Sequence, residues 1–293
     1  MARRRLLLVG RGHLGTFLRT RLGIPDELHY TAELERLDAR ILSGLKPEVV
    51  VNTAGKTDLR WCEDHAREAF RCNVAAPLGV WRALARAGLR ATLLVQLSSG
   101  CIWDGPYDED GKPFEPDSPP QPACFYSWTK ACGDALLMRE TGDRPLCILR
   151  PRQLYSPLPS PRNTLAKLRA YPRLIDTPNS MTSAETVART IEAVMERPAL
   201  FGSGRVLNVY DRGVTSPFRV ATLLAQAGLR PAPERLSKDE LDLQLKPKRV
   251  DAVLHDAWFE QLVQPPGVEA ELSRVIGEYR RAALAGGARE FAQ

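Results

Sequence analysis

The stretch Leu6-Leu7-Leu8-Val9-Gly10-Arg11-Gly12-His13-Leu14-Gly15 decides the fold. Four apolar residues lead directly into a GxGxxG loop, and residues 16–22 continue as a predicted helix. In this context the first glycine makes a tight turn, the second lets the backbone approach a pyrophosphate, and the third lets helix and strand pack closely. The helix N-terminus adds N–H donors and a positive dipole end. The sequence therefore predicts a dinucleotide-binding loop formed by Gly10, Arg11, Gly12, His13, Leu14 and Gly15.

The rest of the first half repeats this alternation of strand and helix. Apolar and β-branched runs predict strands at residues 28–30, 49–51, 91–97, 146–149 and 206–210, and helical spacing predicts helices at residues 63–88, 126–140, 184–196 and 217–228. Crossovers of this length join parallel strands and place helices on both faces of the sheet. We therefore expect an α/β fold, a doubly wound (Rossmann) parallel sheet with a smaller, interleaved C-terminal substrate lobe.

The prolines divide the chain unevenly. Residues 1–155 are expected to form the dinucleotide-binding domain, with the sheet completed by residues 179–215, whereas residues 156–293 mainly form the substrate lobe. The Pro-, Asp- and Gly-rich stretch 104–122 is expected to be a loop, and long loops of this kind are commonly functional.

Composition excludes several classes of protein. The 293 residues carry 41 Lys and Arg against 35 Asp and Glu, a formal net charge of +6 without a dense basic block, which favours small anionic ligands over nucleic acid. No apolar run is long enough for a membrane span or a signal peptide, so we expect a cytoplasmic protein without a membrane partner. The six cysteines form no CxxC pair, and no His/Cys/carboxylate cluster has the spacing of metal ligands. Reduced thiols and no metal site are therefore expected.

A phenol and an amine lie four residues apart at Tyr126 and Lys130, on one face of the predicted helix. A neighbouring ammonium can lower the pKa of a phenol, and such a phenol can donate a proton to a carbonyl that receives a hydride. Ser98 and Ser99 stand at the end of a predicted strand, where ligands gather in an open α/β sheet. Tyr126, Lys130 and Ser99 are therefore the candidate catalytic residues.

The nature of the dinucleotide depends on the end of the second strand. An acidic residue there would bind the adenosine ribose of NAD, but Thr31-Ala32-Glu33 follows the strand, whereas Arg11 could pair with a 2′-phosphate. NADPH is the favoured cofactor, with NADH as the alternative if Glu33 reaches the ribose. Asp38 is a candidate adenine contact or, equally, a helix N-cap.

Together, the glycine loop, the Asn52-Thr53-Ala54-Gly55 segment, the stretch from Ser98 to Gly105 and the YxxxK motif resemble the extended short-chain dehydrogenase/reductase family. Within it the chain is most similar to the dTDP-4-dehydrorhamnose reductase branch of sugar-nucleotide reductases, strongly to about residue 155 and weakly beyond. The resemblance implies that Ser99 hydrogen-bonds the substrate carbonyl, that Tyr126 donates the proton and that Lys130 positions the cofactor. It also implies that Asn52, Thr53, Ala54 and Gly55 line the cofactor site and that Asn73 lies near it.

Departures from the family pattern leave the substrate open. Cys101 falls where related GDP-fucose synthases carry a catalytic cysteine, but an epimerase of that kind also needs a histidine, and residues 163–178 contain none. A reduction of a keto group on a nucleotide-linked deoxysugar is therefore favoured. A sugar-nucleotide epimerase, a ketoreductase of another hydroxylated metabolite, and a non-catalytic regulatory subunit remain alternatives. The expected substrate contacts are Cys101, Trp103, Arg152 and Asn163, and a homodimer is a further expectation.

Overall fold

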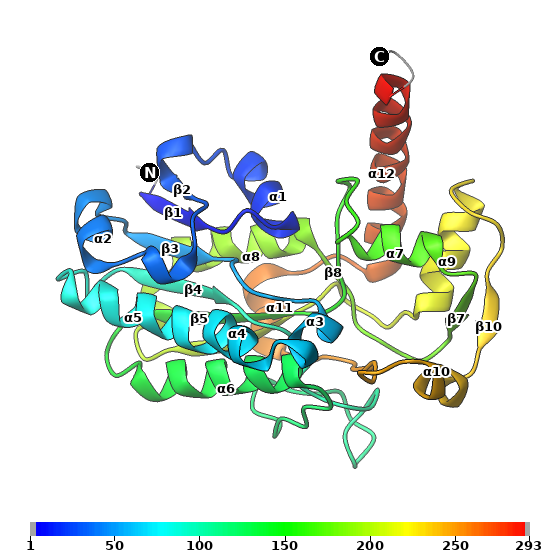
Figure 1. The fold of residues 1–293 in the computed structure, drawn as a ribbon, viewed down its shortest axis with the longest axis horizontal. Helices are drawn as coiled ribbons and strands as arrows, with labels where there is room; N and C mark the ends of the chain where they lie inside the picture. Colours follow the sequence, from blue (N-terminus) through cyan, green and yellow to red (C-terminus); the bar gives the residue numbers. More distant parts are fainter. Residues whose placement is uncertain (1–3, 291–293) are drawn as a thin grey trace.

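The computed structural model describes residues 4–290, with side chains through Leu284. Within these residues six parallel strands form one sheet in the order β2-β1-β3-β4-β5-β9, with helices on both faces (Figure 1). This arrangement confirms the predicted doubly wound α/β fold. The strands of this sheet are β1 (Leu6–Val9), β2 (His29–Tyr30), β3 (Val49–Asn52), β4 (Leu93–Leu97), β5 (Leu146–Pro151) and β9 (Arg205–Val209).

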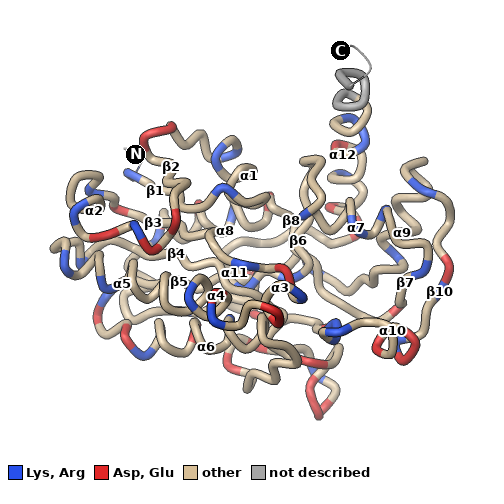
Figure 2. The backbone as a smooth tube through the Cα atoms, in the orientation of Figure 1, with Lys and Arg blue, Asp and Glu red and all other residues tan. Residues whose placement is uncertain are grey.

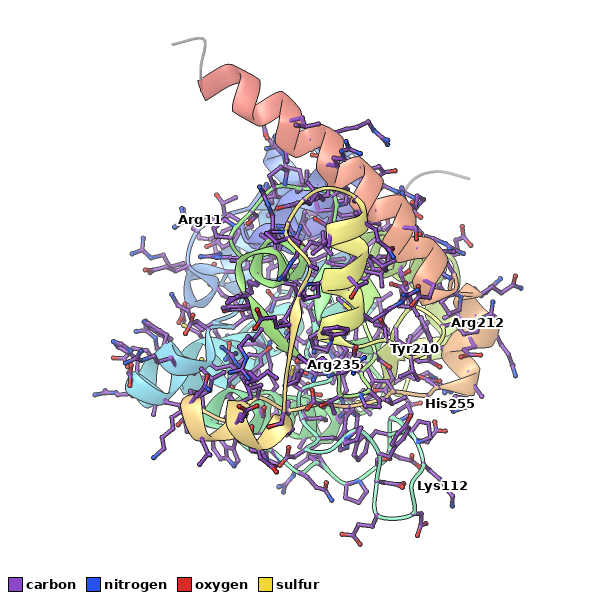
Figure 3. The ribbon with its side chains drawn as sticks, turned by 90° about the vertical axis from the view of Figure 1, so that its right-hand side faces the viewer. Arg11, Lys112, Tyr210, Arg212, Arg235 and His255 are labelled. Atoms are coloured by element: carbon purple, nitrogen blue, oxygen red, sulfur yellow. The ribbon has the colours of Figure 1, made fainter. Side chains whose placement is uncertain are left out.

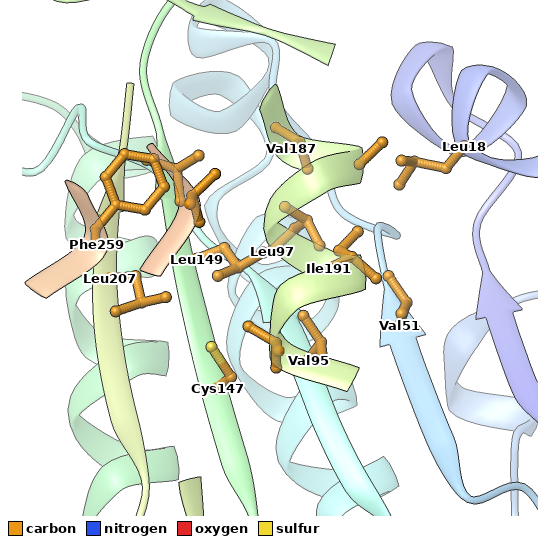
Figure 4. Close-up of a cluster of buried hydrophobic side chains, with 14 of the residues drawn as sticks. Leu18, Val51, Val95, Leu97, Cys147, Leu149, Val187, Ile191, Leu207 and Phe259 are labelled. Carbon is orange, nitrogen blue, oxygen red and sulfur yellow. The ribbon is translucent and has the colours of Figure 1, made fainter. Parts of the chain in front are cut away.

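The apolar strand runs are buried on both faces of the sheet, as parallel strands between two helix layers require. One face packs under α8 (Ala184–Glu196), whose Val187 and Ile191 lie over Val51 and Val95 (Figure 4). On the opposite face, the strand residues Leu7, Val50 and Leu94 belong to a second hydrophobic cluster. Two separate hydrophobic layers thus hold the sheet, and the polar ends of its strands remain available for a site.

The helix predicted over residues 63–88 is wrong as a single element. Asp58 caps α3 (Leu59–Asp64), since its carboxylate accepts from the Trp61 N–H at 2.8 Å, and His65 leaves helical geometry before α4 (Ala66–Phe70) begins. A π-helical turn at Arg71–Ala75 then leads into α5 (Ala76–Arg86). Helical periodicity in the sequence does not reveal such a break, because all the segments remain helical and share one buried side.

The remaining helices agree more closely with the sequence. The predicted helix at 16–22 corresponds to α1 (His13–Arg21), that at 126–140 to α6 (Phe125–Glu140), and that at 217–228 to α9 (Pro217–Gln226); α8 has the bounds predicted. The helix expected after Asp38 corresponds to α2 (Ala39–Leu45). Helices without a sequence prediction are α7 (Thr164–Ala170), α10 (Lys238–Gln244), α11 (Ala257–Val263) and α12 (Val268–Glu290).

A second hydrophobic centre lies beyond the sheet, around α7, α9 and the first part of α12. It contains Tyr155, Leu165, Leu224 and Leu272, and the helix α12 then extends away from the rest of the molecule (Figure 1). Short strand pairs accompany this region: β6 (Leu154–Tyr155) with β8 (Thr182–Ser183), and β7 (Arg173–Ile175) with β10 (Glu234–Leu236).

The 104–122 stretch contains no helix or named strand, as predicted. Its middle is fixed at Phe114, whose N–H donates to Val253 O at 2.8 Å and whose carbonyl accepts from the His255 N–H at 3.0 Å. The tip with Lys112 projects beyond His255 at the lower edge of the molecule (Figure 3). The middle of this loop is therefore held against residues 253–255 by backbone hydrogen bonds.

Charged residues are distributed along the whole chain (Figure 2), in keeping with the scattered arginines of the sequence. In the described part of the chain, no helix is both long and apolar enough to cross a membrane.

Candidate active site

The GxGxxG loop has the geometry that the sequence predicts. Gly10 adopts φ +109°, which disfavours any side chain, and a Cβ on Gly15 would lie 2.3 Å from the Gly10 carbonyl oxygen. A Cβ on Gly12 would meet nothing closer than Arg162 Nη1 at 3.8 Å. No side chain caps α1, so the N–H groups of its first turn are left without a capping side chain and are available to a ligand. This is a cradle of the kind that receives a pyrophosphate.

The segment after β3 closes the other side of the cradle. Thr53 Oγ1 donates to Val9 O at 2.8 Å and lies 2.6 Å from the position of a Cβ on Gly10. The buried Asn52 amide donates to Gln96 Oε1 at 2.8 Å, and its oxygen accepts from the Ala54 N–H at 3.0 Å. The side chains of Asn52 and Thr53 therefore hold the loop in place, and Ala54 and Gly55 provide the backbone along the cleft.

Tyr126 and Lys130 point from α6 toward the end of the same strand, β4. The Tyr126 hydroxyl is hydrogen-bonded to Ser99, and Lys130 Nζ donates to Leu97 O at 3.3 Å. Ser99 Oγ also accepts from the Cys101 N–H at 3.1 Å. All three predicted catalytic residues are nearly buried, with 5–6% of each exposed. The helix register thus brings phenol, amine and hydroxyl together at one strand end.

The electrostatics of this group differ from the sequence expectation. Burial raises the pKa of Tyr126, the nearby Cys101 raises it further, and the hydrogen bond to Ser99 opposes the change. Burial lowers the pKa of Lys130, and Asp134 opposes that shift. Within the chain itself, removal of the phenol from water therefore has the largest effect on the pKa of Tyr126, and the lowering of this pKa by Lys130 stays a prediction for the complex with cofactor.

Asn73 lies in the π-helical turn and fixes the neighbouring loop. Its side-chain oxygen accepts from the Lys56 N–H at 2.8 Å, and its amide donates to Lys56 O at 2.9 Å and to Thr129 Oγ1 at 3.1 Å. A Cβ on Gly55 would lie 3.1 Å from Asn73 Oδ1 and 3.5 Å from Lys130 Nζ. The turn therefore presents Asn73 beside Gly55 and Lys130. Turns of this type recur at functional sites, but sequence periodicity does not mark them.

Basic residues of the C-terminal half lie over the glycine loop. His13 Nε2 is 3.0 Å from Ser156 Oγ, and burial lowers the pKa of His13, as do the charges of Lys167 and Arg162. Burial also lowers the pKa of Lys167, with further lowering by Arg249 and Arg162 and an opposing effect of Asp58. Four basic groups therefore gather around the cradle. Arg162 was not among the predicted site residues, because its position over Gly12 depends on a contact between distant parts of the chain.

Two predicted substrate contacts are wrong. Trp103 is fully buried, stacks on Phe114 at 5.2 Å between ring centroids and donates from its indole to Ser118 O at 3.2 Å. Asn163 is also fully buried, and its amide donates to Ser156 O at 2.7 Å and Leu158 O at 2.9 Å. Neither side chain can reach a substrate, because local packing and local hydrogen bonds occupy both.

The other two predicted contacts border the site. Cys101 is partly exposed, and its sulfur accepts from Arg152 Nη1 at 2.8 Å. Arg152 is itself buried, and its guanidinium donates to Asn179 Oδ1 at 3.0 Å and to Val250 O. Arg152 therefore supports Cys101 from behind.

The residues proposed to select the dinucleotide lie at the surface. Asp38 caps α2, since its carboxylate accepts from the Ile41 N–H at 2.9 Å, which is the alternative that the sequence left open for it. Arg11 is exposed and points outward (Figure 3). Among the residues that the structure describes, no group of three His, Cys, Asp or Glu side chains is arranged to hold a metal.

Comparison with known proteins places this geometry in a family. The model of the RmlD substrate binding domain matches residues 4–253. The chain is 32% identical over 224 residues to the Arabidopsis thaliana bifunctional dTDP-4-dehydrorhamnose 3,5-epimerase/dTDP-4-dehydrorhamnose reductase, an alignment of 69% of this chain and 71% of that protein. It is also 32% identical over 223 residues to the Arabidopsis trifunctional UDP-glucose 4,6-dehydratase/UDP-4-keto-6-deoxy-D-glucose 3,5-epimerase/UDP-4-keto-L-rhamnose-reductase RHM1. That alignment includes 69% of this chain but only 32% of the trifunctional protein.

Solved structures share the fold at lower identity. The L780 UDP-rhamnose synthase of Acanthamoeba polyphaga mimivirus superposes with a TM-score of 0.80 at 21% identity, covering 94% of this chain and 100% of the viral one. A dTDP-4-dehydrorhamnose reductase of Bacillus anthracis in complex with NADP gives a TM-score of 0.77 at 17% identity, covering 94% and 99%. With the family model matched over most of its length, the chain belongs to the RmlD substrate binding domain family.

Proposed function

We propose that the protein is a reductase that transfers hydride from NADPH to a keto group of a nucleotide-linked deoxysugar. The observation that carries this proposal is the meeting of Ser99, Tyr126 and Lys130 at the end of β4, beside the glycine cradle. Relatives named as dTDP-4-dehydrorhamnose reductases and UDP-4-keto-L-rhamnose reductases support the substrate class.

The residues around the cradle fit a dinucleotide. The open first turn of α1 and Arg162 would hold the pyrophosphate, and Lys130 beside Gly55 would reach the nicotinamide ribose. The bound cofactor would supply the hydride. Arg11, exposed at the cradle, is available to a 2′-phosphate, which favours NADPH, and a structural neighbour was solved with NADP. NADH remains the second choice.

The three catalytic side chains divide the chemistry. The Ser99 hydroxyl donates a hydrogen bond to the substrate carbonyl and stabilises the negative charge that develops on oxygen. Tyr126 gives its proton to that oxygen. Lys130, as an ammonium, makes the loss of this proton easier, and an anionic carbonyl oxygen near Tyr126 favours the same transfer.

Residues 156–293 are proposed to form mainly the substrate-binding lobe, and residues 1–155, with the sheet completed by residues 179–215, are proposed to form the cofactor-binding domain. Burial lowers the pKa of Lys167 most, and the like charge of Arg249 lowers it further. A diphosphate would relieve that repulsion, since it brings two negative charges to the same place. A homodimer and a cytoplasmic location stay predictions, which sedimentation and cell fractionation would test.

Absorbance at the NADPH band tests the proposal directly. The purified protein is incubated with NADPH and a panel of 4-keto-6-deoxy sugar nucleotides carrying dTDP or UDP. Oxidation of NADPH with one member, and its loss in Tyr126→Phe, is the expected result. Binding of NADPH without turnover of any panel member would favour the regulatory-subunit alternative.

A further inference from the structure

Lys130 is a buried amine that needs a compensating negative charge. The groups that act on it come from three elements: Asp134 from α6, Cys62 from α3 and Cys101 from the loop after β4. The Lys130 ammonium donates a hydrogen bond to Leu97 O at 3.3 Å. Asp134 is the carboxyl group among these three described neighbours, and the other two are thiols. Because a carboxyl group is far more acidic than a thiol, Asp134 is the neighbour that can offer a negative charge to Lys130.

Asp134 lies one helical turn beyond Lys130 and is equally buried, with 4% exposed. Both side chains line a small cavity of about 10 Å³ together with Asn73, Gln96 and Ser98. The Oδ2 atom of Asp134 accepts from Arg150 Nε at 2.8 Å, and 7% of the Arg150 side chain is exposed. The carboxylate therefore pairs with a buried cation on β5 and shares a cavity with the buried amine on its own helix.

The second arm of Arg150 reaches the 104–122 loop. Its Nη1 donates to Pro116 O at 2.8 Å, and its guanidinium lies 5.3 Å from the ring centroid of Trp103. The Trp103 indole in turn donates to Ser118 O at 3.2 Å. Hydrogen bonds thus join Asp134 through Arg150 to the loop, and Asp134 shares a cavity with Lys130.

We propose that Asp134, fixed by Arg150, is a positioning residue that keeps Lys130 protonated and links it to the 104–122 loop. The carboxylate does not touch the substrate and acts through Lys130. Without Asp134 the burial of Lys130 is no longer opposed, so the amine loses its proton at lower pH. Without Arg150 the negative charge of Asp134 is no longer neutralised by the guanidinium and stabilises the Lys130 ammonium more strongly. The amine therefore keeps its proton to higher pH. The contribution to turnover rests on the proposed reductase function, whereas the effect on the protonation of Lys130 does not.

The protonation of Lys130 can be measured without turnover. Trace acylation with acetic anhydride over a pH series, followed by mass spectrometry of the Lys130 peptide, gives the pH at which half of the amine reacts. Asp134→Asn is expected to lower this midpoint by about one pH unit, and Arg150→Gln is expected to raise it. Glu140→Gln is the matched control, since Glu140 pairs with Arg82 near the exposed end of the same helix and should leave the midpoint unchanged.

Opposite directions in the two variants cannot come from a general loosening of the fold, which would move both alike. If Asp134→Asn does not fold, Arg150→Gln alone still decides: an unchanged or lowered midpoint overturns the proposal. An unchanged midpoint in a folded Asp134→Asn variant also overturns the proposal.

Turnover provides the second readout. With a substrate from the NADPH panel, the high-pH limb of the kcat profile of Asp134→Asn should move to lower pH by a similar amount, and Asp134→Glu should restore it. A merely structural role would lower kcat equally at every pH. A labelling shift with no activity in any panel member would refute the reductase function and leave the positioning role of Asp134 standing.

Discussion

Two buried tyrosines, Tyr126 and Tyr155, have opposite surroundings. The Tyr155 hydroxyl donates to Asp211 Oδ2 at 2.6 Å, and Asp211 also accepts from the Ser183 N–H at 2.8 Å and from Thr186 Oγ1 at 2.5 Å. Tyr126 has a hydroxyl partner, Ser99, and thiols around it. Burial raises the pKa of both phenols, but next to Tyr155 the carboxylate of Asp211 raises it further, whereas next to Tyr126 the hydrogen bond of Ser99 lowers it.

The difference teaches how one residue type serves two purposes. In the Asp211 cluster, which comprises Tyr155, Asp211, Ser183 and Thr186, every proton is directed at a carboxylate, so the group joins β6, β8 and α8 rigidly. At the end of β4 the described groups that act on the Tyr126 hydroxyl are one hydroxyl and three thiols, so its proton is not committed to a carboxylate. Local partners rather than burial therefore separate the structural phenol of Tyr155 from the phenol that is proposed to be catalytic.

The largest effect is expected for Tyr126→Phe, which removes the hydroxyl that distinguishes Tyr126 from Tyr155 as a proposed proton donor. We expect a loss of about 10²- to 10⁴-fold in kcat, because the proton donor is gone. NADPH affinity, measured by fluorescence titration, should change little. Equal turnover in the variant and the parent protein would remove Tyr126 from the mechanism.

A substitution in the glycine loop tests the proposed cofactor site, which lies at the same end of the sheet as Tyr126. In Gly15→Ala the new methyl would lie 2.3 Å from Gly10 O, so the loop must shift; we expect a loss of about 1–3 kcal/mol in unfolding free energy and a weaker NADPH complex. Gly44→Ala is the control, since nothing lies within 4 Å of its Cβ position. Urea unfolding and NADPH titration measure both. Similar behaviour of the two variants would show that the close contact at Gly15 is unimportant.

The Asp211 cluster makes a prediction on pH. Burial raises the pKa of Asp211 to about 6 from an ordinary 3.8. Well below pH 4 the carboxyl is protonated in both the folded and the unfolded chain. Between about pH 4 and pH 6 the unfolded chain ionises it while burial keeps it protonated in the folded protein, so the unfolded state gains stability, and above pH 6 both states carry the charge. The contribution of Asp211 to stability should therefore fall by about 2–3 kcal/mol between pH 4 and pH 7.

Asp211→Asn removes the titration of this carboxyl group. Burial also raises the pKa values of Asp251 and Asp256, but these two residues are present in both proteins, so their contribution cancels in the comparison. Urea unfolding at pH 4.5 and 7.5 should show a smaller loss of stability in the variant than in the parent. An identical pH dependence would contradict the assignment.

The smallest effect is expected for Tyr155→Phe. Asp211 keeps its other donors, so we expect a loss of about 1 kcal/mol in unfolding free energy and nearly unchanged kcat. Thermal unfolding and the NADPH assay measure the two. A large fall in kcat with unchanged stability would place Tyr155 in the catalytic group and remove the contrast with Tyr126.

Sequence reasoning reached the parts of the molecule that depend on local pattern. Strand β1 and helix α8 have the predicted bounds, because apolar runs and helical spacing are continuous there. The two- and three-residue strands β6, β7, β8 and β10 escaped prediction, since so few residues carry no periodicity.

The candidate site divides in the same way. The GxGxxG loop and the YxxxK spacing are local and could be recognised, although their roles stay proposals. The placement of Arg162 over Gly12 and the pairing of Asp134 with Arg150 depend on residues that only the folded chain brings together. The burial of Trp103 likewise depends on Phe114, which reaches it through the course of the 104–122 loop.

The outward course of α12 has a practical consequence. Its first turns pack into the lobe around Leu272 and Ile276, while Leu284 is exposed and the helix continues away from the sheet (Figure 1). A fluorescent reporter attached through Leu284→Cys would be carried by an exposed position outside the packed lobe, so single-molecule binding measurements could be made without disturbing its core.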